Sequence, residues 1–218
     1  KVIHIGDDAF NLWLVIALCV GMPARLKLTG DSSLRFLDIA PLRHFLPQLG
    51  VRLTNVIPSQ DGLPVRMECS GLVPHMIRLA DDLPEDFVAA LVLASPFWET
   101  GCRLTLPEKE PRLLPLVLDV LSGCGMKIER KDRDILVERG DLSVPAEPVV
   151  PMDASVAATV LMFPGFNGGR AVLEGVWGKS EASSLVEKIL RGAGLNVKYG
   201  AGLVECTGKE RETAAPAP

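Results

Sequence analysis

One pattern of apolar segments occurs three times along the chain, and this repeat limits the folds that the sequence can adopt. An amphipathic stretch ends in glycine at Gly50, at Gly125 and at Gly194, and each glycine is followed by residues typical of a strand. A glycine at this position closes a helix, because it adopts the left-handed conformation at no steric cost. The three glycines lie 75 and 69 residues apart. The sequence therefore predicts three helix–strand pairs of the same kind.

A second set of segments follows the same period. Residues 87–93 are apolar nearly all round, which predicts a buried helix that starts after Pro84 and ends at Pro96. Equivalent apolar stretches lie at residues 10–21 and 154–163. A strand pattern follows each of the three stretches, starting at Arg25, Cys102 and Arg170. Two signatures that share one period indicate an internal repeat of helix, strand, helix, strand and strand.

The repeat predicts an α/β (α+β) fold built from three units, at residues 1–70, 71–140 and 141–208. One unit cannot bury its apolar helix alone, so we expect the helices inside and the sheets on the outer faces. Residues 144–151 contain three prolines and are expected to be extended. Residues 209–218 are charged and then rich in Ala and Pro, which predicts a disordered tail.

Composition and charge argue against several classes of protein. The net charge of −4 disfavours a nucleic-acid surface, which needs a basic footprint. The apolar stretch at residues 10–21 is too short to span a membrane, and no segment has the pattern of a signal peptide. The five cysteines lack metal-ligand spacing and the three histidines are scattered. We therefore expect a cytoplasmic protein with buried thiols, no metal and no cofactor.

The order of several short segments is similar to that of a known family. The segments are residues 6–13 (Gly-Asp-Asp-Ala-Phe-Asn-Leu-Trp), 28–35, 87–96 and 152–158. Together they resemble the enolpyruvyl transferases, and among these most closely the 5-enolpyruvylshikimate-3-phosphate (EPSP) synthase family. The resemblance is collinear over nearly the whole chain, and it depends on order and spacing more than on any single motif.

This resemblance implies a fold and an activity. The family fold consists of βαβαββ units, three to a domain, with two domains that close over the substrates. The implied reaction moves the enolpyruvyl group of phosphoenolpyruvate to the 5-hydroxyl of shikimate 3-phosphate, a step of aromatic amino-acid biosynthesis. Both substrates are anionic, so such a site needs Lys and Arg donors and a carboxylate for proton transfer.

Three residues are the candidates for this chemistry. The resemblance aligns Asp153 with the acid/base aspartate of the family, although Asp153 is equally placed to cap the helix that follows it. Arg35 aligns with one of two substrate-binding arginines, and the second arginine is replaced by Leu37. Lys179 lies near a later substrate-contacting segment, and the alternative is a lysine on the surface. We expect the charged residues 130–134 to form a solvated turn.

Other positions depart from the family pattern. Asp8 and Trp13 stand where the family has a small residue and an arginine, and we expect the carboxylate and the indole to repel and obstruct phosphoenolpyruvate. Residues 84–86 (Pro-Glu-Asp) replace a Ser-Ser-Gln that holds the substrate phosphate. Residues 111–113 (Pro-Arg-Leu) retain a basic residue but lack the tyrosine of the family.

These departures leave three functions open. The first is an EPSP synthase-like protein of the shikimate pathway, with doubtful catalysis by this chain alone. The second is a non-catalytic binding or regulatory module on the same scaffold, whose acidic patch would comprise Asp7, Asp8, Glu85 and Asp86. The third, least favoured, is an enolpyruvyl transferase acting on a nucleotide sugar. The chain has about half of the family's length, so we expect either a fragment or a homodimer that restores six units.

Overall fold

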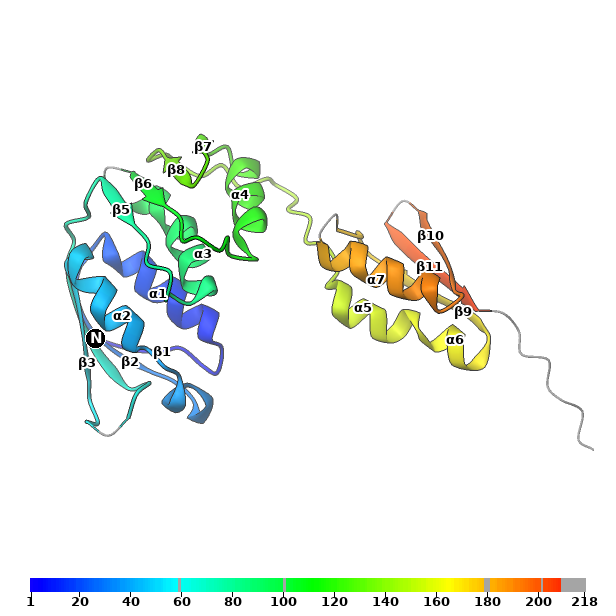
Figure 1. Ribbon diagram of the computed structural model, residues 1–218, viewed down its shortest axis with the longest axis horizontal. Coiled ribbons are helices and arrows are strands. Elements are labelled where there is room, and N and C mark those ends of the chain that lie inside the picture. The colour runs from blue at the N-terminus through cyan, green and yellow to red at the C-terminus, as the bar shows by residue number, and fades with distance from the viewer. Residues whose placement is uncertain (59, 100, 179–180, 201, 209–218) are drawn as a thin grey trace, which may run out of the picture. The chain divides into compact units, whose positions relative to one another are not determined.

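Among the described residues, three β-sheets are distributed over two parts of the chain. The computed structural model describes residues 1–58, 60–99, 101–178, 181–200 and 202–208. Within these residues, the two parts are Lys1–Pro145, with two sheets, and Ala146–Pro218, with one (Figure 1). The fold is mixed α/β, as the sequence predicts.

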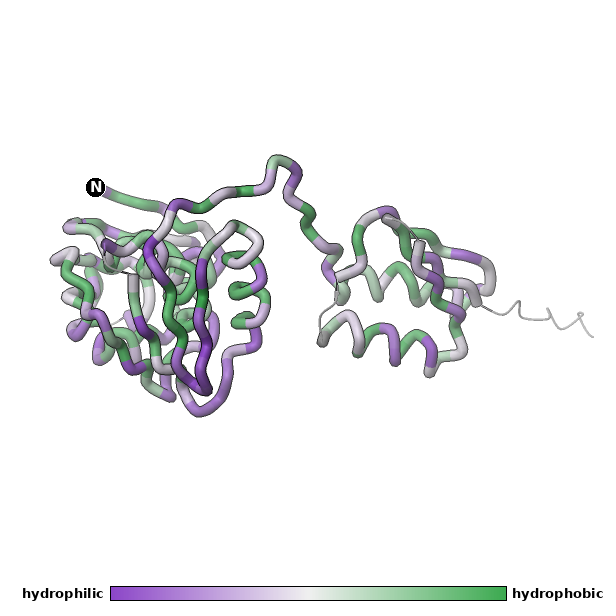
Figure 2. Tube along the Cα trace, turned by 90° about the horizontal axis from the view of Figure 1, so that it is seen from above, coloured by the Kyte–Doolittle hydropathy of each residue, from purple (hydrophilic) through white to green (hydrophobic). Residues whose placement is uncertain are grey.

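The first sheet packs one of its two faces against the core. Its strands are β1 (Val2–His4), β2 (Pro23–Thr29), β3 (Val51–Asn55) and β4 (Val65–Ser70), in the order β1-β2-β4-β3. β1 is parallel to β2, and the other neighbours are antiparallel. Along β4, buried and exposed side chains alternate, which places one face on the core and the other in solvent. Figure 2 shows hydrophobic and hydrophilic residues interspersed along this part of the chain.

The second sheet repeats the topology of the first. Its strands are β5 (Met76–Arg78), β6 (Cys102–Thr105), β7 (Ile128–Lys131) and β8 (Asp134–Val137), in the order β5-β6-β8-β7. Again the first two strands are parallel and the others antiparallel. Of the charged residues 130–134, only Asp132 and Arg133 form the turn of the β7–β8 hairpin, with Asp132 in the left-handed conformation. Arg130, Lys131 and Asp134 belong to the paired strands, so the predicted turn is shorter than expected.

The helices of Lys1–Pro145 are α1 (Ala9–Val20), α2 (Ala40–Phe45), α3 (Glu85–Ala94) and α4 (Leu114–Gly123). Short 3-10 turns follow at Ser32–Phe36, Leu46–Leu49 and Ser95–Phe97. α1 and α3 pack side by side, and both sheets share their core with these helices (Figure 1). Seven of the ten residues of α3 are buried, which confirms the buried helix predicted from residues 87–93.

Aromatic rings fill the centre of this core. The ring of Phe87 meets those of Trp13 and Phe45 edge-on, at centroid distances of 6.0 and 6.1 Å. Trp98 is fully buried, and its Nε1–H donates a hydrogen bond of 3.1 Å to the carbonyl oxygen of Ala17. These contacts join α3 and the turn after it to α1.

The second part of the chain has one sheet with helices. Its strands are β9 (Gly169–Glu174), β10 (Asn196–Gly200) and β11 (Leu203–Gly208), antiparallel in the order β10-β11-β9. The helices are α5 (Ala154–Leu161), α6 (Phe163–Asn167) and α7 (Glu181–Gly192). Leu161, Leu190, Val204 and Cys206 lie at the centre of its small core.

Several predicted boundaries change in the structure. The helix expected before Gly50 ends at Phe45 and continues as a 3-10 turn, because Pro47 has no N–H for the α-helical hydrogen bond. The apolar helix at residues 154–163 is buried on one face only, with Val156 and Val160 exposed. Residues 144–151 have no regular secondary structure. Lys179 and the tail at residues 209–218 lie outside the described residues.

The division into three repeated units, 1–70, 71–140 and 141–208, stays a proposal. The first two sheets have the same strand order and directions, and the third lacks a leading parallel strand among its described residues. Every helix in the described part of the chain is too short or too polar to cross a membrane.

The ring cluster predicts a large effect on stability. Phe87→Ala removes a fully buried ring and leaves a cavity, so we expect a loss of about 3–5 kcal/mol in the free energy of unfolding. Urea unfolding followed by tryptophan fluorescence measures this loss. Phe36→Ala is the matched control, because 85% of Phe36 is exposed, and it should change stability by less than about 0.5 kcal/mol. Equal effects of the two substitutions would contradict the assignment of the core.

Candidate functional site

Asp153 caps helix α5. Its Oδ1 accepts hydrogen bonds from the backbone N–H groups of Ser155, at 2.8 Å, and Val156, at 3.0 Å. The backbone of Asp153 is extended, as expected of an N-cap residue. The second oxygen, Oδ2, makes no hydrogen bond among the described residues, and the residue is exposed. One oxygen of the carboxylate therefore holds the helix while the other remains open to solvent.

Arg35 lies on an exposed 3-10 turn. This turn is tied to the chain at Gly62 and Leu63, whose N–H groups donate to the carbonyl oxygens of Arg35, at 3.2 Å, and Leu34, at 3.0 Å. A side chain at Gly62 would collide with the carbonyl oxygen of Leu34, so the close approach requires glycine. The Arg35 side chain makes no ion pair within the described residues.

The structure describes two of the three candidate residues. Arg35 belongs to Lys1–Pro145 and Asp153 to Ala146–Pro218, so neither part contains both. Lys179 lies outside the described residues.

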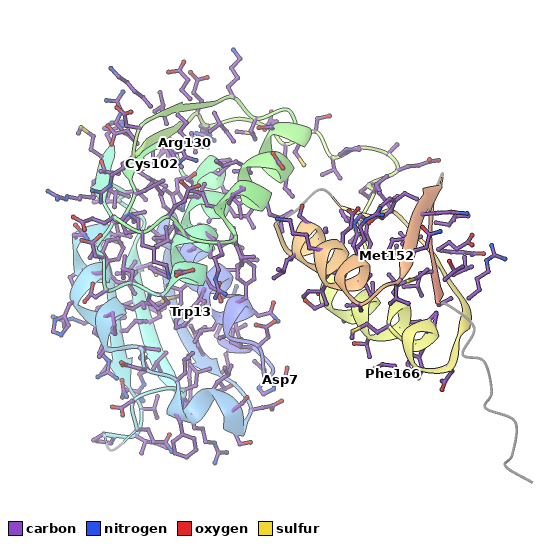
Figure 3. All side chains as sticks on the ribbon, turned by 45° about the vertical axis from the view of Figure 1, so that its right-hand side comes forward. Asp7, Trp13, Cys102, Arg130, Met152 and Phe166 are labelled. Atoms are coloured by element: carbon purple, nitrogen blue, oxygen red, sulfur yellow. The ribbon has the colours of Figure 1, made fainter. Side chains whose placement is uncertain are left out.

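The start of α1 differs from the expectation that an indole obstructs the site. Asp8 caps the helix, since its Oδ1 accepts the N–H of Phe10 at 2.6 Å. Trp13, labelled in Figure 3, is only 2% exposed. Its ring packs against that of Phe87 in the core. The expectation that Trp13 obstructs phosphoenolpyruvate was wrong, because helical periodicity turns this residue to the buried face of α1.

The start of α3 lies beside a segment that is distant in the sequence. Glu85, from residues 84–86, contacts Lys109 and also Arg112, from residues 111–113. The carboxylate of Glu85 accepts hydrogen bonds from Lys109 Nζ, at 2.5 Å, and from Arg112 Nε, at 3.2 Å. The bond from Lys109, together with the bonds from Arg112, holds the pKa of the Glu85 carboxyl below its ordinary value. Two cations therefore meet at the positive end of α3, and a carboxylate of the chain itself lies between them.

Two further arginines of Lys1–Pro145 also have partners. Arg43 donates to the carbonyl oxygen of Asp61 at 3.0 Å. Arg130 forms a two-bond fork with the carboxylate of Glu110, and the bonds from Arg130 lower the pKa of that carboxyl. A sequence reading misses these pairs, because the partners are 18 and 20 residues apart and the fold alone brings them together.

Most of the cysteines are buried in the folded chain. Four of the five are buried and all are free thiols. Burial raises the pKa of Cys102 to about 12, and burial together with the nearby Cys19 raises that of Cys69 to about 11. A thiol with a raised pKa is a poor nucleophile. Within the described part of the chain, no group of three His, Cys, Asp or Glu side chains is arranged to hold a metal ion.

Comparison with known proteins identifies related sequences and a shared fold. The model of the EPSP synthase (3-phosphoshikimate 1-carboxyvinyltransferase) family matches residues 2–215. A 3-phosphoshikimate 1-carboxyvinyltransferase of Methanocaldococcus jannaschii is 24% identical over 203 residues, which cover 91% of this chain and 47% of the relative. That of Halobacterium salinarum is 28% identical over 206 residues, with the same coverage.

The structural comparison agrees with the sequence comparison. An EPSP synthase from Acinetobacter baumannii has a TM-score of 0.72 at 18% identity, and the match covers 96% of this chain and 48% of that structure. This similarity shows the fold. The chain spans about half the length of the relatives whose match covers most of it.

The cap at α5 predicts a local effect. Asp153→Ala removes the acceptor for the N–H groups of Ser155 and Val156, so we expect a loss of about 1 kcal/mol in stability. Hydrogen exchange at these two amides measures it. Asp153→Asn is the matched control, because asparagine caps a helix without a charge and should keep most of the protection. If exchange at these amides does not change in Asp153→Ala, the cap is not formed in solution.

The pair at α3 predicts a dependence on pH. The pKa of Glu85 is lowered in the folded state, so the stability that it contributes is present above the ordinary carboxyl pKa of about 4.3 and is lost as the pH falls through the folded pKa. Wild type should have a higher Tm than Glu85→Gln at about pH 7, and the two should converge near pH 3. Lys109→Gln should remove part of the same difference, and a constant difference at all pH values would contradict the pairing.

Proposed function

Because the chain belongs to the EPSP synthase family, we propose that it takes part in enolpyruvyl transfer from phosphoenolpyruvate to shikimate 3-phosphate, in the cytoplasm, as one portion of a site that it does not complete alone. The observation that carries this proposal is the collinear match over residues 2–215 to about half the length of the relatives. The activity named for those relatives belongs to proteins about twice as long.

Two of the residues that would contribute, Asp153 and Arg35, are exposed. In this proposal Asp153 uses its open Oδ2 to move a proton, while Oδ1 keeps the cap of α5. Arg35 would bind a substrate anion, since its guanidinium makes no ion pair in the described part of the chain. Lys179 is a further candidate contact from the sequence alone.

The paired cations support the view that the site is incomplete. Two substrates that carry phosphate and carboxylate groups need several free Lys or Arg donors. Lys109 and Arg112 are bound to Glu85, and Arg43 to a backbone carbonyl. Additional donors would therefore come from polypeptide beyond this chain, either the remaining length of such a protein or a second copy in a homodimer.

One observation favours the alternative, a non-catalytic binding or regulatory module. Glu85 places a carboxylate between Lys109 and Arg112, where an anionic ligand would otherwise bind two cations. A carboxylate that is part of the chain competes with such a ligand at very high effective concentration. In this alternative the scaffold persists without the transfer reaction.

Thermal unfolding with millimolar shikimate 3-phosphate and phosphoenolpyruvate tests the proposal. A ligand at about 100 times its Kd stabilises the folded state by roughly 2.7 kcal/mol, so we expect a higher Tm with the substrates but no release of phosphate by the chain alone. Arg35→Ala should abolish the increase in Tm. Arg103→Ala, which removes an exposed arginine from β6, is the matched control and should keep it.

Two outcomes of this experiment would contradict the proposal. An unchanged Tm would favour the non-catalytic module. Phosphate release by the chain alone would show that the site is complete. Sedimentation of the same sample would separate a single chain from a homodimer.

A further inference from the structure

The outer face of the first sheet carries an excess of positive charge. Arg25 and Lys27 on β2, Arg66 on β4 and Arg52 on β3 alternate with the residues that face the core, so all four lie on the solvent side. Glu68 is the one acidic residue of β2, β3 and β4. We name the four cations with Glu68 the basic sheet face. This face holds four of the chain's 23 Lys and Arg and one of its 27 Asp and Glu, which leaves 19 cations and 26 anions elsewhere.

The strand register sets two of these cations against each other. Lys27 is directly opposite Arg66 across the β2–β4 pair. Like charges at directly opposed positions destabilise a sheet. Neither side chain has an ion-pair partner in the described part of the chain. In the neighbouring row Glu68 lies between Arg25 and Arg52, and its carboxylate is 3.8 Å from Arg25 Nε.

The other two sheets provide an internal comparison. On the outer face of the second sheet, Arg78, Arg103 and Lys131 are accompanied by Glu129 and Asp134. On the third, Arg170 and Lys198 are accompanied by Glu174 and Glu205, and Arg170 binds Glu205 at 2.8 Å. Charges are close to balanced on both of these faces, so the excess on the first sheet is not a general property of the fold.

The basic sheet face is also hollowed. Two shallow depressions of about 450 and 320 Å³ lie on it and share Arg25 and Glu68 in their linings. Arg52 lines the first depression, and Lys27 and Arg66 line the second. A ligand that lies along both depressions meets all four cations.

We propose that the basic sheet face is a docking surface for an acidic polypeptide segment in extended conformation. Alternate side chains of an extended segment are about 6.7 Å apart, the same spacing as that of Arg25 and Lys27 along β2. Carboxylates at alternate positions would therefore follow one strand and neutralise the opposed Lys27 and Arg66. Complementary charge of this kind increases association rate and specificity. Four cations around an acid, in a chain of net charge −4, form too small a footprint for a polynucleotide.

This inference is independent of the transfer reaction, because none of the four cations is a candidate for the substrate site. Its test uses the whole chain and a fluorescent peptide of alternating Glu and Ser. The double variant Lys27→Thr with Arg66→Thr should weaken binding about tenfold at low salt, because two contacts to carboxylates are lost. The matched control, Arg78→Thr with Arg103→Thr, removes the same charge from the second sheet and should bind as wild type does.

A second readout separates a docking surface from an ordinary solvated face. Arg66→Thr relieves the repulsion with Lys27, so it should raise the Tm while it weakens binding of the peptide. A lower Tm would contradict the unfavourable pairing. Absence of peptide binding to wild type, or an equal loss in both double variants, would overturn the proposal. Tighter binding of single-stranded DNA of equal charge would also overturn it and point to a polynucleotide instead.

Discussion

The packing of α1 against α3 is the contact on which the first part of the chain depends. Each of the two sheets of this part has one apolar face that must be covered. α3 is buried almost all round, so other elements of the chain must pack on every side of it. The ring of Phe87 meets Trp13 from α1 and Phe45 from α2, so one side chain joins three helices. The indole of Trp98 adds a polar contact to the backbone of α1, at Ala17. These contacts place Glu85, at the start of α3, beside Lys109 and Arg112.

The sequence predicts the elements of this fold better than their ends or their surface contacts. A continuous apolar run identifies α3, and β3 begins directly after Gly50, where the sequence predicts a strand, because burial selects the side chains along these elements. β1 has only three residues, too few for a periodic signal. The contact of Glu85 with Lys109 joins residues 24 positions apart on the surface, where many arrangements of charge fit the same core. Asp153 has a short-range signal, the position before a helix, but that signal is the same for a cap as for an acid/base residue.

Carboxylates at the starts of helices bear both on the stability of the fold and on the binding of anions. Caps at α1 and α5 use Asp8 and Asp153, and α3 begins with Glu85 and Asp86, so acidic residues stand at the start of three helices. Each stabilises its own helix through the dipole or a backbone bond. The same carboxylates occupy the positions at which a helix would bind an anionic ligand. Local stability and anion binding therefore compete at the same atoms, and in this chain the local interactions are the ones formed.

The outer faces of the sheets are free of the packing constraint that fixes the inner faces. A residue such as Met67 or Val65 must fit the shared core, whereas Arg66 between them contacts solvent and its neighbours on the sheet. The three sheets can therefore carry different charges on their outer faces without any change in the fold. The second and third sheets use this freedom to balance their charges, which lowers the energy of an exposed face. In the first sheet Lys27 lies opposite Arg66, an arrangement that the fold does not require. In the proposed complex, the carboxylates of an acidic segment would neutralise these two charges.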